Sequence, residues 1–243
     1  MTTEQSLLEF SLIENGLDFI REALLYLSDE TEPRKLKYSI LHLFSGIEIL
    51  LKAKLLSEHW SLIFANIDKA RLEDVNRAEF SSVRFDKLLQ RLANICGMTI
   101  SKSDDQLLSR IRKLRNQLEH FSTNFRSSEI IPIVNGGVSF IISFITNYLP
   151  ALSDNERELL EDIQVRLGRL VTYIDHRTVE IEPEISKLQE ENCLVVRCPR
   201  CLQFAMVLGD GDPKCYFCLY SSTPEDVSGE HVDRLLQNEP WFD

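Results

Sequence analysis

The scarcity of glycine and proline in the first 192 residues constrains the fold more than any other feature of this chain. Residues 1–192 hold ten of the 17 glycines and prolines, and the last 51 residues hold the other seven. Average usage of about 12% would give about 29 such residues in a chain of this length. We therefore expect a mostly helical protein whose turn-rich part begins near residue 193.

Apolar residues recur with helical spacing through most of the first 190 residues. These stripes predict helices over about 4–28, 34–57, 85–96, 103–122 and 137–149. The last of these follows the Gly136–Gly137 pair, which is expected to break the helical structure before it. Capping boxes are predicted at Ser103 and Ser153, and a long helix after Ser153 is expected to be interrupted at Pro183. Residues 58–80 carry only a weak pattern, which fits a short helix or a loop.

The C-terminal part contains two C-x-x-C pairs that are separated by 13 residues. Each pair can form a tight turn with converging thiolates, and two such turns complete a tetrahedral zinc site. The predicted ligands are Cys198, Cys201, Cys215 and Cys218. Residues 203–208 have strand character and 209–213 read as a turn, which together predict a zinc ribbon. Because four thiolates leave no open coordination position, we expect one structural zinc ion per chain.

Cys96 and Cys193 lie outside the spacing of the two C-x-x-C turns, here called knuckles, and are interpreted as ordinary thiols. Aromatic residues and cations flank the knuckles, and they would suit either stacking on nucleic-acid bases or covering a small core: Arg197, Arg200, Phe204, Lys214, Tyr216, Phe217 and Tyr220. We favour the core interpretation, because Asp210 and Asp212 lie beside the same hairpin, although a protein or RNA partner at the ribbon stays open.

The overall class is therefore all-α: an antiparallel helical bundle followed by a long helical stalk and a small β zinc ribbon. The domains are expected at 1–150 for the bundle, 151–192 for the stalk, 193–222 for the ribbon and 223–243 for an acidic tail. The net charge is −11, yet residues 1–150 hold 18 basic and 19 acidic groups. The acidity therefore belongs to the C-terminal part and does not exclude a nucleic acid as partner of the bundle.

Targeting signals are not expected at the N-terminus or within the chain. The first residues show no basic region followed by an apolar one, which is the pattern of a secretory signal. The longest nearly apolar run, 138–149, is shorter than the roughly 20 residues that span a bilayer. We therefore expect a cytoplasmic protein without a membrane partner, in which the cysteines are thiols or metal ligands.

The most informative polar cluster lies on the helix predicted over 103–122. Its buried stripe is expected to consist of Leu107, Ile111, Leu114, Leu118 and Phe121. Asn116 and His120 are spaced i and i+4, on the opposite side of the helix from that stripe, which is an unusual place for a core histidine. Arg112, Lys113 and Arg115 surround them. An ordinary solvated face with an Arg115–Glu119 ion pair is the plainest alternative.

The arrangement Arg115-Asn116-x-x-x-His120, on a late helix of an antiparallel bundle, resembles the R-x4-6-H signature of the HEPN superfamily. The helix predicted over 34–57 agrees, since it looks like the HEPN helix with a glutamate amid apolar residues, here Glu48, and a lysine one turn later, Lys52. The resemblance covers roughly residues 5–150.

The resemblance implies a metal-independent endoribonuclease, often a toxin or an antiviral defence effector, that acts on RNA as a homodimer. His120 would serve as general base and acid, and Arg115 would stabilise the phosphate. Asn116 could orient the phosphate or the imidazole, and Arg112 and Lys113 would bind the substrate. In HEPN toxins paired with nucleotidyltransferase antitoxins a tyrosine follows the histidine by two residues; here that residue is Ser122, so such control is not expected.

The alternative is a non-catalytic HEPN dimer that acts as an adaptor, with the ribbon binding RNA or a protein. Other enzyme classes find no support, because the chain lacks the P-loop, the G-x-S-x-G elbow and the H-E-x-x-H zinc motif. A zinc deaminase is excluded as well, since its H-x-E and P-C-x-x-C elements are missing.

Overall fold

Helices form most of the computed structural model, which describes residues 10–28, 32–121, 124–209 and 211–229. The longer helices are α1 (Leu12–Leu27), α2 (Pro33–Glu58), α4 (Phe85–Ile95), α5 (Lys102–His120), α6 (Ser127–Tyr148), α7 (Asp154–Leu167) and α8 (Val171–Glu190). Two 3-10 turns, η1 (Trp60–Ile63) and η2 (Ile67–Lys69), and the short α3 (Leu72–Arg77) occupy the weakly patterned segment. The mostly helical class is therefore confirmed.

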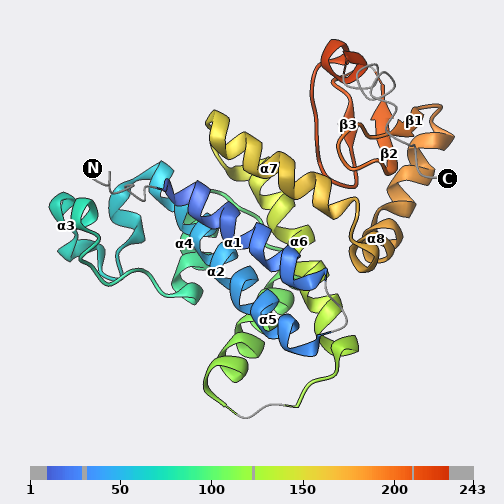
Figure 1. Cartoon of the computed structure of the whole chain (residues 1–243). Helices are drawn as coiled ribbons and strands as arrows, with labels where there is room; N and C mark the ends of the chain where they lie inside the picture. The colour runs from blue at the N-terminus through green and yellow to red at the C-terminus, as the bar shows by residue number, and fades with distance from the viewer. Residues whose placement is uncertain (1–9, 29–31, 122–123, 210, 230–243) are drawn as a thin grey trace, which may run out of the picture.

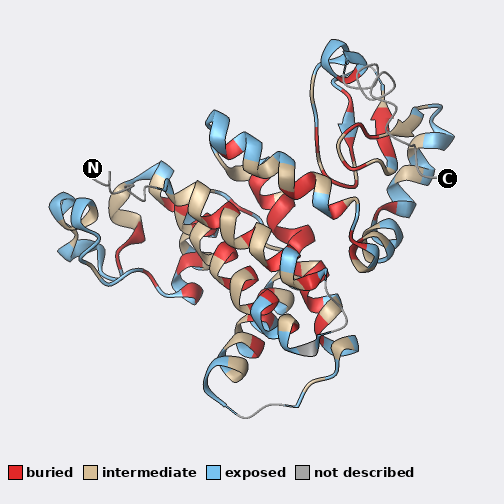
Figure 2. Cartoon of the chain, viewed as in Figure 1, coloured by how far each residue is buried: buried red, intermediate tan, exposed pale blue. Residues whose placement is uncertain are grey.

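Helices α1 and α2 form the centre of the bundle and run antiparallel along one another (Figure 1). Helix α2 also packs against α4, α5 and α6, which explains its wide apolar surface. The buried side chains form one continuous core that runs through the bundle to the C-terminal cysteines (Figure 2). A residue on α2 can therefore touch α5 directly.

Helix α6 is longer than the sequence pattern predicts. It begins at Ser127, about ten residues before the predicted start, and it contains both Gly136 and Gly137. A Cβ on Gly137 would lie 2.8 Å from the side chains of Ile111 and Leu43. The glycine therefore permits close packing between helices, and the prediction of a break at this pair was wrong.

Helix α6 also has the length and composition of a membrane span, but 61% of its apolar window is buried inside the protein. It carries the buried polar residues Asn135 and Ser139, and Asn135 donates a hydrogen bond to the carbonyl of Thr172 in α8. Such burial is typical of the core helix of a bundle. Its apolar character is thus explained by contacts with its neighbours.

The segment after α6 differs from one long stalk. The chain breaks at Gly168 to Leu170 between α7 and α8, whereas α8 continues through Pro183, so the predicted interruption at Pro183 was wrong. Pro183 is exposed, where water can take over the hydrogen bond that proline removes. Helix α7 packs on α1 and α8 packs on α6, so both helices extend the bundle.

Three of the longer helices, α1, α5 and α7, begin at a serine side-chain cap. Ser153 forms the predicted capping box with Glu156. Helix α5, by contrast, begins two residues before the predicted box, with Ser101 as the N-cap that accepts a hydrogen bond from the Asp104 N–H. Ser11 caps α1 with Glu14, and its hydroxyl also donates to the Glu156 carboxylate across the α1–α7 contact, at 2.6 Å.

The C-terminal sheet has three antiparallel strands in the order β1 (Leu194–Arg197), β2 (Phe204–Leu208) and β3 (Lys214–Cys215). Val195 pairs with Val207 in the first ladder, and Met206 pairs with Cys215 in the second. The ribbon lies beside α8 at one end of the molecule, and α3 lies at the other end (Figure 1). Most of the predicted acidic tail, and Ser122, fall outside the described residues.

Candidate functional site

Helix α5 carries the candidate catalytic residues and ends at His120. Leu108, Ile111 and Leu114 are buried, and they hold the helix against α2 and α6. Phe121, predicted as the end of the buried stripe, is instead 71% exposed. It is the C-cap residue in extended conformation, so its side chain no longer follows the helical spacing. That prediction was wrong, because the helix ends one residue earlier.

Arg115 lies at the edge of the buried side of α5. Its guanidinium carbon is 4.5 Å from the centroid of the Phe44 ring, which is buried in α2. The Nη1 group donates to the Asn116 Oδ1 at 3.0 Å and to the Glu119 carboxylate at 2.8 Å. The arginine is therefore fixed by a stacked ring on one side and by two acceptors on the other.

His120 and Asn116 are both exposed to solvent. The His120 side chain is 63% exposed, and its Nε2 lies 3.6 Å from the Glu119 carboxylate. Phe121 lies edge-on to the imidazole, with the ring centroids 6.5 Å apart. Glu119 thus contacts both the arginine and the histidine, and Arg115, Asn116 and His120 form one open polar surface, named here the Arg115–His120 face.

The two cations predicted to bind substrate lie in different surroundings. Arg112 forms an ion pair with Asp86 of α4. Lys113 is exposed and, together with Arg110, lines an open groove of about 410 Å³ between α5 and α6. On α2, Lys52 forms an ion pair with Glu48 at 2.7 Å and donates to the Ser82 hydroxyl. Of Arg112 and Lys113, it is Lys113 that has the accessible position that a substrate contact needs.

The four predicted metal ligands come together in one buried cluster. The sulfur atoms of Cys198, Cys201, Cys215 and Cys218 all lie within 4.8 Å of one another. The Cys198–Cys218 and Cys201–Cys215 sulfurs are 3.8 and 3.7 Å apart. Zinc–sulfur bonds of about 2.3 Å in a tetrahedron place sulfurs about 3.8 Å apart. The cluster could therefore hold one metal ion.

In each half of the cluster a backbone N–H points to the first cysteine, and a residue with positive φ follows the second cysteine. The Arg200 N–H points to the Cys198 sulfur at 3.4 Å, and the Cys218 N–H points to the Cys215 sulfur at 3.5 Å. Leu202 and Leu219, which directly follow the second cysteine of each pair, both have left-handed backbones with φ near 63° and 60°. Leucine disfavours this conformation by about 1–2 kcal/mol. A bound metal ion could offset this strain, because each positive φ directly follows a cysteine pair that would bind the ion.

Hydrogen bonding and burial shift the pKa values of the clustered thiols. The pKa of Cys198 lies far below its ordinary value, chiefly because Cys201 donates a hydrogen bond to its sulfur. Burial raises the pKa of Cys218. Outside the cluster, burial also raises the pKa of Cys96, and Cys193 is half-buried. Neither of these two thiols belongs to the group of four mutually close sulfurs.

The ribbon is attached to the helices by specific contacts. The Gln164 amide donates to the Cys218 carbonyl at 3.0 Å, and Arg177 donates to the carbonyls of Tyr216 and Phe217. Tyr173, buried in α8, meets the Phe217 ring edge-on, and burial raises the pKa of Tyr173 to about 12. The ribbon therefore shares its core with the bundle.

Gly168 lies directly against the backbone of the first cysteine pair. A Cβ at this position would lie 2.0 Å from the carbonyl oxygen of Cys201. The chain thus turns between α7 and α8 where the first knuckle touches it. The roles of Gly168, Gln164 and Arg177 were not predicted from the sequence, where the only signal is a glycine inside an otherwise regular helical stripe.

The aromatic residues of the ribbon divide into two groups. Phe217 and Tyr220 are buried and Tyr216 is half-buried, which agrees with the core interpretation. Phe204 is 64% exposed, so the interpretation fails for this residue. It is the first residue of β2, and its side chain points away from the ribbon core.

Comparisons with family models, with curated proteins and with solved structures return no match for this chain.

Proposed function

We propose that this protein is a metal-independent endoribonuclease of HEPN type that acts as a homodimer. The observation that carries the proposal is the Arg115–His120 face. Arg115 is held in place by Phe44, and Asn116 and His120 lie exposed beside it. A fixed cation next to an accessible imidazole is the minimum that RNA cleavage through the 2′-hydroxyl requires.

In the proposed reaction the His120 imidazole takes the proton from the ribose 2′-hydroxyl. The 2′-oxygen then forms a bond to phosphorus, and the bond from phosphorus to the 5′-oxygen of the next nucleotide breaks. Arg115 offsets the negative charge that grows on the non-bridging phosphate oxygens. The leaving 5′-oxygen receives a proton, so the products are a 2′,3′-cyclic phosphate and a free 5′-hydroxyl.

A dimer supplies the acid for this reaction. One chain carries a single histidine on this face, and a two-fold pairing would bring His120 of a second copy to the leaving oxygen. In such a pairing the exposed Phe121 ring, which lies beside His120, would come to lie near the second copy. Lys113 would contact the RNA backbone, and Asn116 would orient the phosphate or the imidazole.

We further propose that the four-cysteine cluster holds zinc, and that this zinc is structural. Four buried thiolates with sulfur spacings near those of a tetrahedral zinc site leave no position for a substrate. The ion would stabilise the ribbon, which is too small to fold on a hydrophobic core of its own. The cleavage reaction would then need no metal ion, and the protein would act in the cytoplasm as a toxin or a defence effector.

The decisive experiment is an RNA digest with EDTA present, using wild type, His120→Ala and Arg115→Ala. We expect wild type to leave cyclic phosphate ends and both variants to lose at least 100-fold in rate, in line with general acid–base catalysis. His59→Ala is the matched control, since His59 is another exposed histidine at the end of a helix. Cleavage by His120→Ala at the wild-type rate would eliminate the proposal.

A second candidate function is a non-catalytic dimeric adaptor, and one observation favours it. The Glu119 carboxylate contacts both Arg115 and His120, so the groups needed for phosphate binding already have an anionic partner. In the adaptor, RNA incubated with wild type stays intact, and a protein partner is retained through the ribbon. Loss of that partner in Cys198→Ser, with no cleavage by wild type, would support the adaptor.

A further inference from the structure

A groove of about 440 Å³ lies where the ribbon docks on the junction of α7 and α8. Three arginines line it, one from the end of α7 and two from the ribbon: Arg169, Arg197 and Arg200. None of the described residues that line the groove is an aspartate or a glutamate. In a chain with a net charge of −11, such a lining is complementary to an anion.

Phe204 gives the groove an exposed aromatic surface. The guanidinium carbon of Arg197 lies over the Phe204 ring, 4.8 Å from its centroid. The ring is 64% exposed even though the other phenylalanine of the ribbon, Phe217, is buried. An exposed ring supported by a guanidinium is a surface on which a nucleobase can stack.

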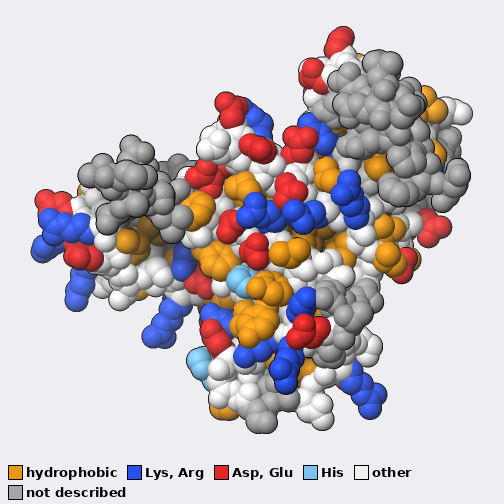
Figure 3. Space-filling view, viewed as in Figure 1, with side chains coloured by type: hydrophobic (Ala, Val, Ile, Leu, Met, Phe, Trp, Pro, Cys, Tyr) orange, Lys and Arg blue, Asp and Glu red, His pale blue; other side chains and the backbone are white. Residues whose placement is uncertain are grey.

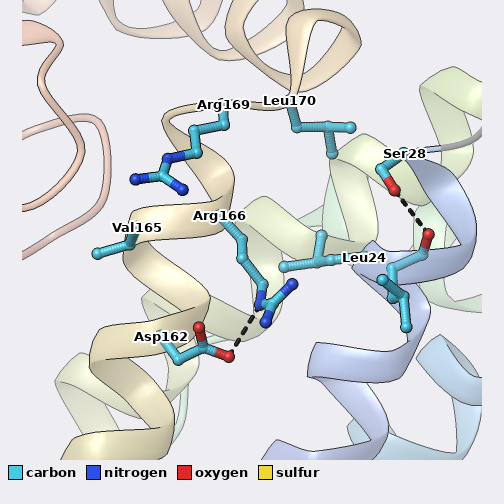
Figure 4. Close-up of a pocket in the computed structure, with 8 residues that line it drawn as sticks. Leu24, Ser28, Asp162, Val165, Arg166, Arg169 and Leu170 are labelled. Atoms are coloured by element: carbon cyan, nitrogen blue, oxygen red, sulfur yellow. Dashed lines mark hydrogen bonds and ion pairs between the residues drawn. The ribbon is translucent and has the colours of Figure 1, made fainter.

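Two arginines stand at positions that suit phosphate groups. Arg169 lies on the same side of α7 as Val165, away from the Arg166–Asp162 ion pair (Figure 4). Arg200 is held by an ion pair with Glu161 and lies over the Tyr220 ring at 4.6 Å. These contacts order the Arg200 guanidinium, which lowers the entropic cost of a phosphate contact, but a phosphate would share this arginine with Glu161.

The wider surface supports this assignment. Figure 3 shows Lys and Arg side chains in a row across the face between α1 and α7, bordered by Asp and Glu side chains. Arg166 and Arg169, together with Leu24 and Ser28 of the α1 end, line a smaller adjoining hollow of about 220 Å³. Val165 and Arg169 line both hollows, and in the smaller hollow Arg166 is paired with Asp162, so Arg169 is the cation that the two hollows share.

We propose that this groove, named here the ribbon groove, binds single-stranded nucleic acid. One base stacks on Phe204, and the adjoining phosphates contact Arg169 and Arg200. Its volume suits about one nucleotide, since small-molecule sites measure about 300–1,000 Å³. Binding depends on unstacked bases and on the backbone charge, so RNA and DNA strands of the same sequence are both ligands. The ribbon groove uses none of the residues of the Arg115–His120 face, so its binding does not depend on cleavage.

The test is fluorescence anisotropy with labelled oligoadenylate probes of about 12 nucleotides, one of 2′-O-methyl RNA and one of DNA. Neither probe has a free 2′-hydroxyl, so neither can be consumed by the proposed cleavage. We expect Phe204→Ala to raise the Kd about tenfold, through the loss of one stacked base. We expect Arg169→Ala to reduce the slope of log Kd against log salt by about 0.7, the value for one phosphate contact on a single strand.

Matched controls are Phe10→Ala and Arg77→Ala, which remove an exposed phenylalanine and an exposed arginine elsewhere. Both should bind like wild type. Thermal unfolding and metal content, measured on every variant, identify any loss that comes from misfolding. The proposal is overturned if wild type fails to bind either probe at low salt, or if Phe204→Ala binds as wild type does. It is also overturned if a polyglutamate peptide displaces the probes when peptide and probe supply the same concentration of negative charges.

The same experiment separates this site from the cleavage reaction. Binding that depends on Phe204, in a protein that leaves RNA intact, would support the ribbon groove and contradict only the nuclease. Cleavage of RNA by wild type, together with unchanged probe affinity in Phe204→Ala, would support the nuclease and contradict the ribbon groove.

Discussion

The guanidinium of Arg115 on α5 lies against the ring of Phe44 on α2, 4.5 Å from its centroid. Phe44 is almost fully buried, so the bundle core positions one side of the arginine, while the exposed Asn116 and Glu119 hold the other side. The motif on α5 is therefore tied to the α2–α5 contact. A cation held this way is organised before any ligand arrives, which lowers the entropic cost of binding an anion.

The first prediction concerns the competition between Glu119 and a phosphate for Arg115. Glu119→Gln removes the ion pair at 2.8 Å and one negative charge beside His120. Exposed pairs of this kind contribute about 0.2–1 kcal/mol, so the Kd of an uncleavable 2′-O-methyl RNA should fall about threefold. Anisotropy at fixed salt measures the change, with Glu119→Gln made in the Phe204→Ala background so that the ribbon groove contributes little to the Kd.

Asp105→Asn is the control for this variant, because it removes an exposed acid near the other end of α5. It should leave the affinity unchanged. An equal gain in both variants would mean that only the net charge of the protein had changed. Weaker binding by Glu119→Gln would show that Glu119 supports the ligand instead of competing with it.

The second prediction concerns the cysteine cluster. Wild type, purified without chelator, should contain about one zinc ion per chain, because four thiolates complete one tetrahedral site. Cys215→Ser should lose the ion and unfold at a lower temperature, since the ribbon covers Tyr173 of the bundle. Elemental analysis and thermal unfolding measure the two effects. Cys193→Ser, outside the cluster, should retain the metal; a metal-free wild type would contradict the assignment.

The third prediction concerns Gly168. Helical propensity alone predicts that Gly168→Ala stabilises the protein by about 0.4–1 kcal/mol, because the residue has an ordinary right-handed backbone. The close approach to the Cys201 carbonyl predicts the opposite, a loss of about 1–3 kcal/mol. We expect the loss, measured as a lower urea midpoint. Gly209→Ala, where a Cβ would meet open space, should change the midpoint very little.

The fourth prediction is a pH dependence at the α1–α7 contact. Burial alone would raise the pKa of Glu156, but hydrogen bonds from Ser11 and Ser153 outweigh it and hold this pKa below its ordinary value. The carboxylate therefore adds stability that is fully present above the pKa of an unfolded glutamate, about 4.3. That contribution is lost as the pH falls through the lower folded pKa.

Glu156→Gln should accordingly cost about 1–2 kcal/mol near neutral pH, through weaker hydrogen bonds from Ser11 and Ser153. The difference from wild type should stay constant above about pH 5 and shrink below it. Urea unfolding at several pH values measures this difference. Glu158→Gln, an exposed neighbour, should show no such trend, and a constant difference down to pH 3 would rule out the linkage.

Much of the helical architecture can be predicted from apolar spacing. The stripes that contain Ile20, Leu43 and Leu88 are buried on one side of α1, α2 and α4, as their spacing indicates. The two C-x-x-C pairs likewise predict the cysteine cluster, because two short knuckles can converge with few other constraints. Such features depend on local spacing, which a sequence displays directly.

The errors arise where a distant contact decides the structure. Gly137 suggests a break, yet it allows α6 to approach Ile111 and Leu43. Phe121 fits the spacing of the apolar stripe on α5, but the helix ends at His120. No local pattern indicates that Arg115 stacks on Phe44 or that Phe204 stays outside the ribbon core. These outcomes depend on partners that lie far apart in sequence.

The absence of a side chain at residue 168 also provides a criterion for tracing the history of this architecture. Any related chain that docks its cysteine ribbon in the same way needs glycine at the matching position, because the Cys201 carbonyl occupies the place of a Cβ. A homologue with a larger residue there must seat its ribbon elsewhere. One amino acid in an alignment would thus separate lineages that share the present docking from lineages in which the bundle and the ribbon were joined differently.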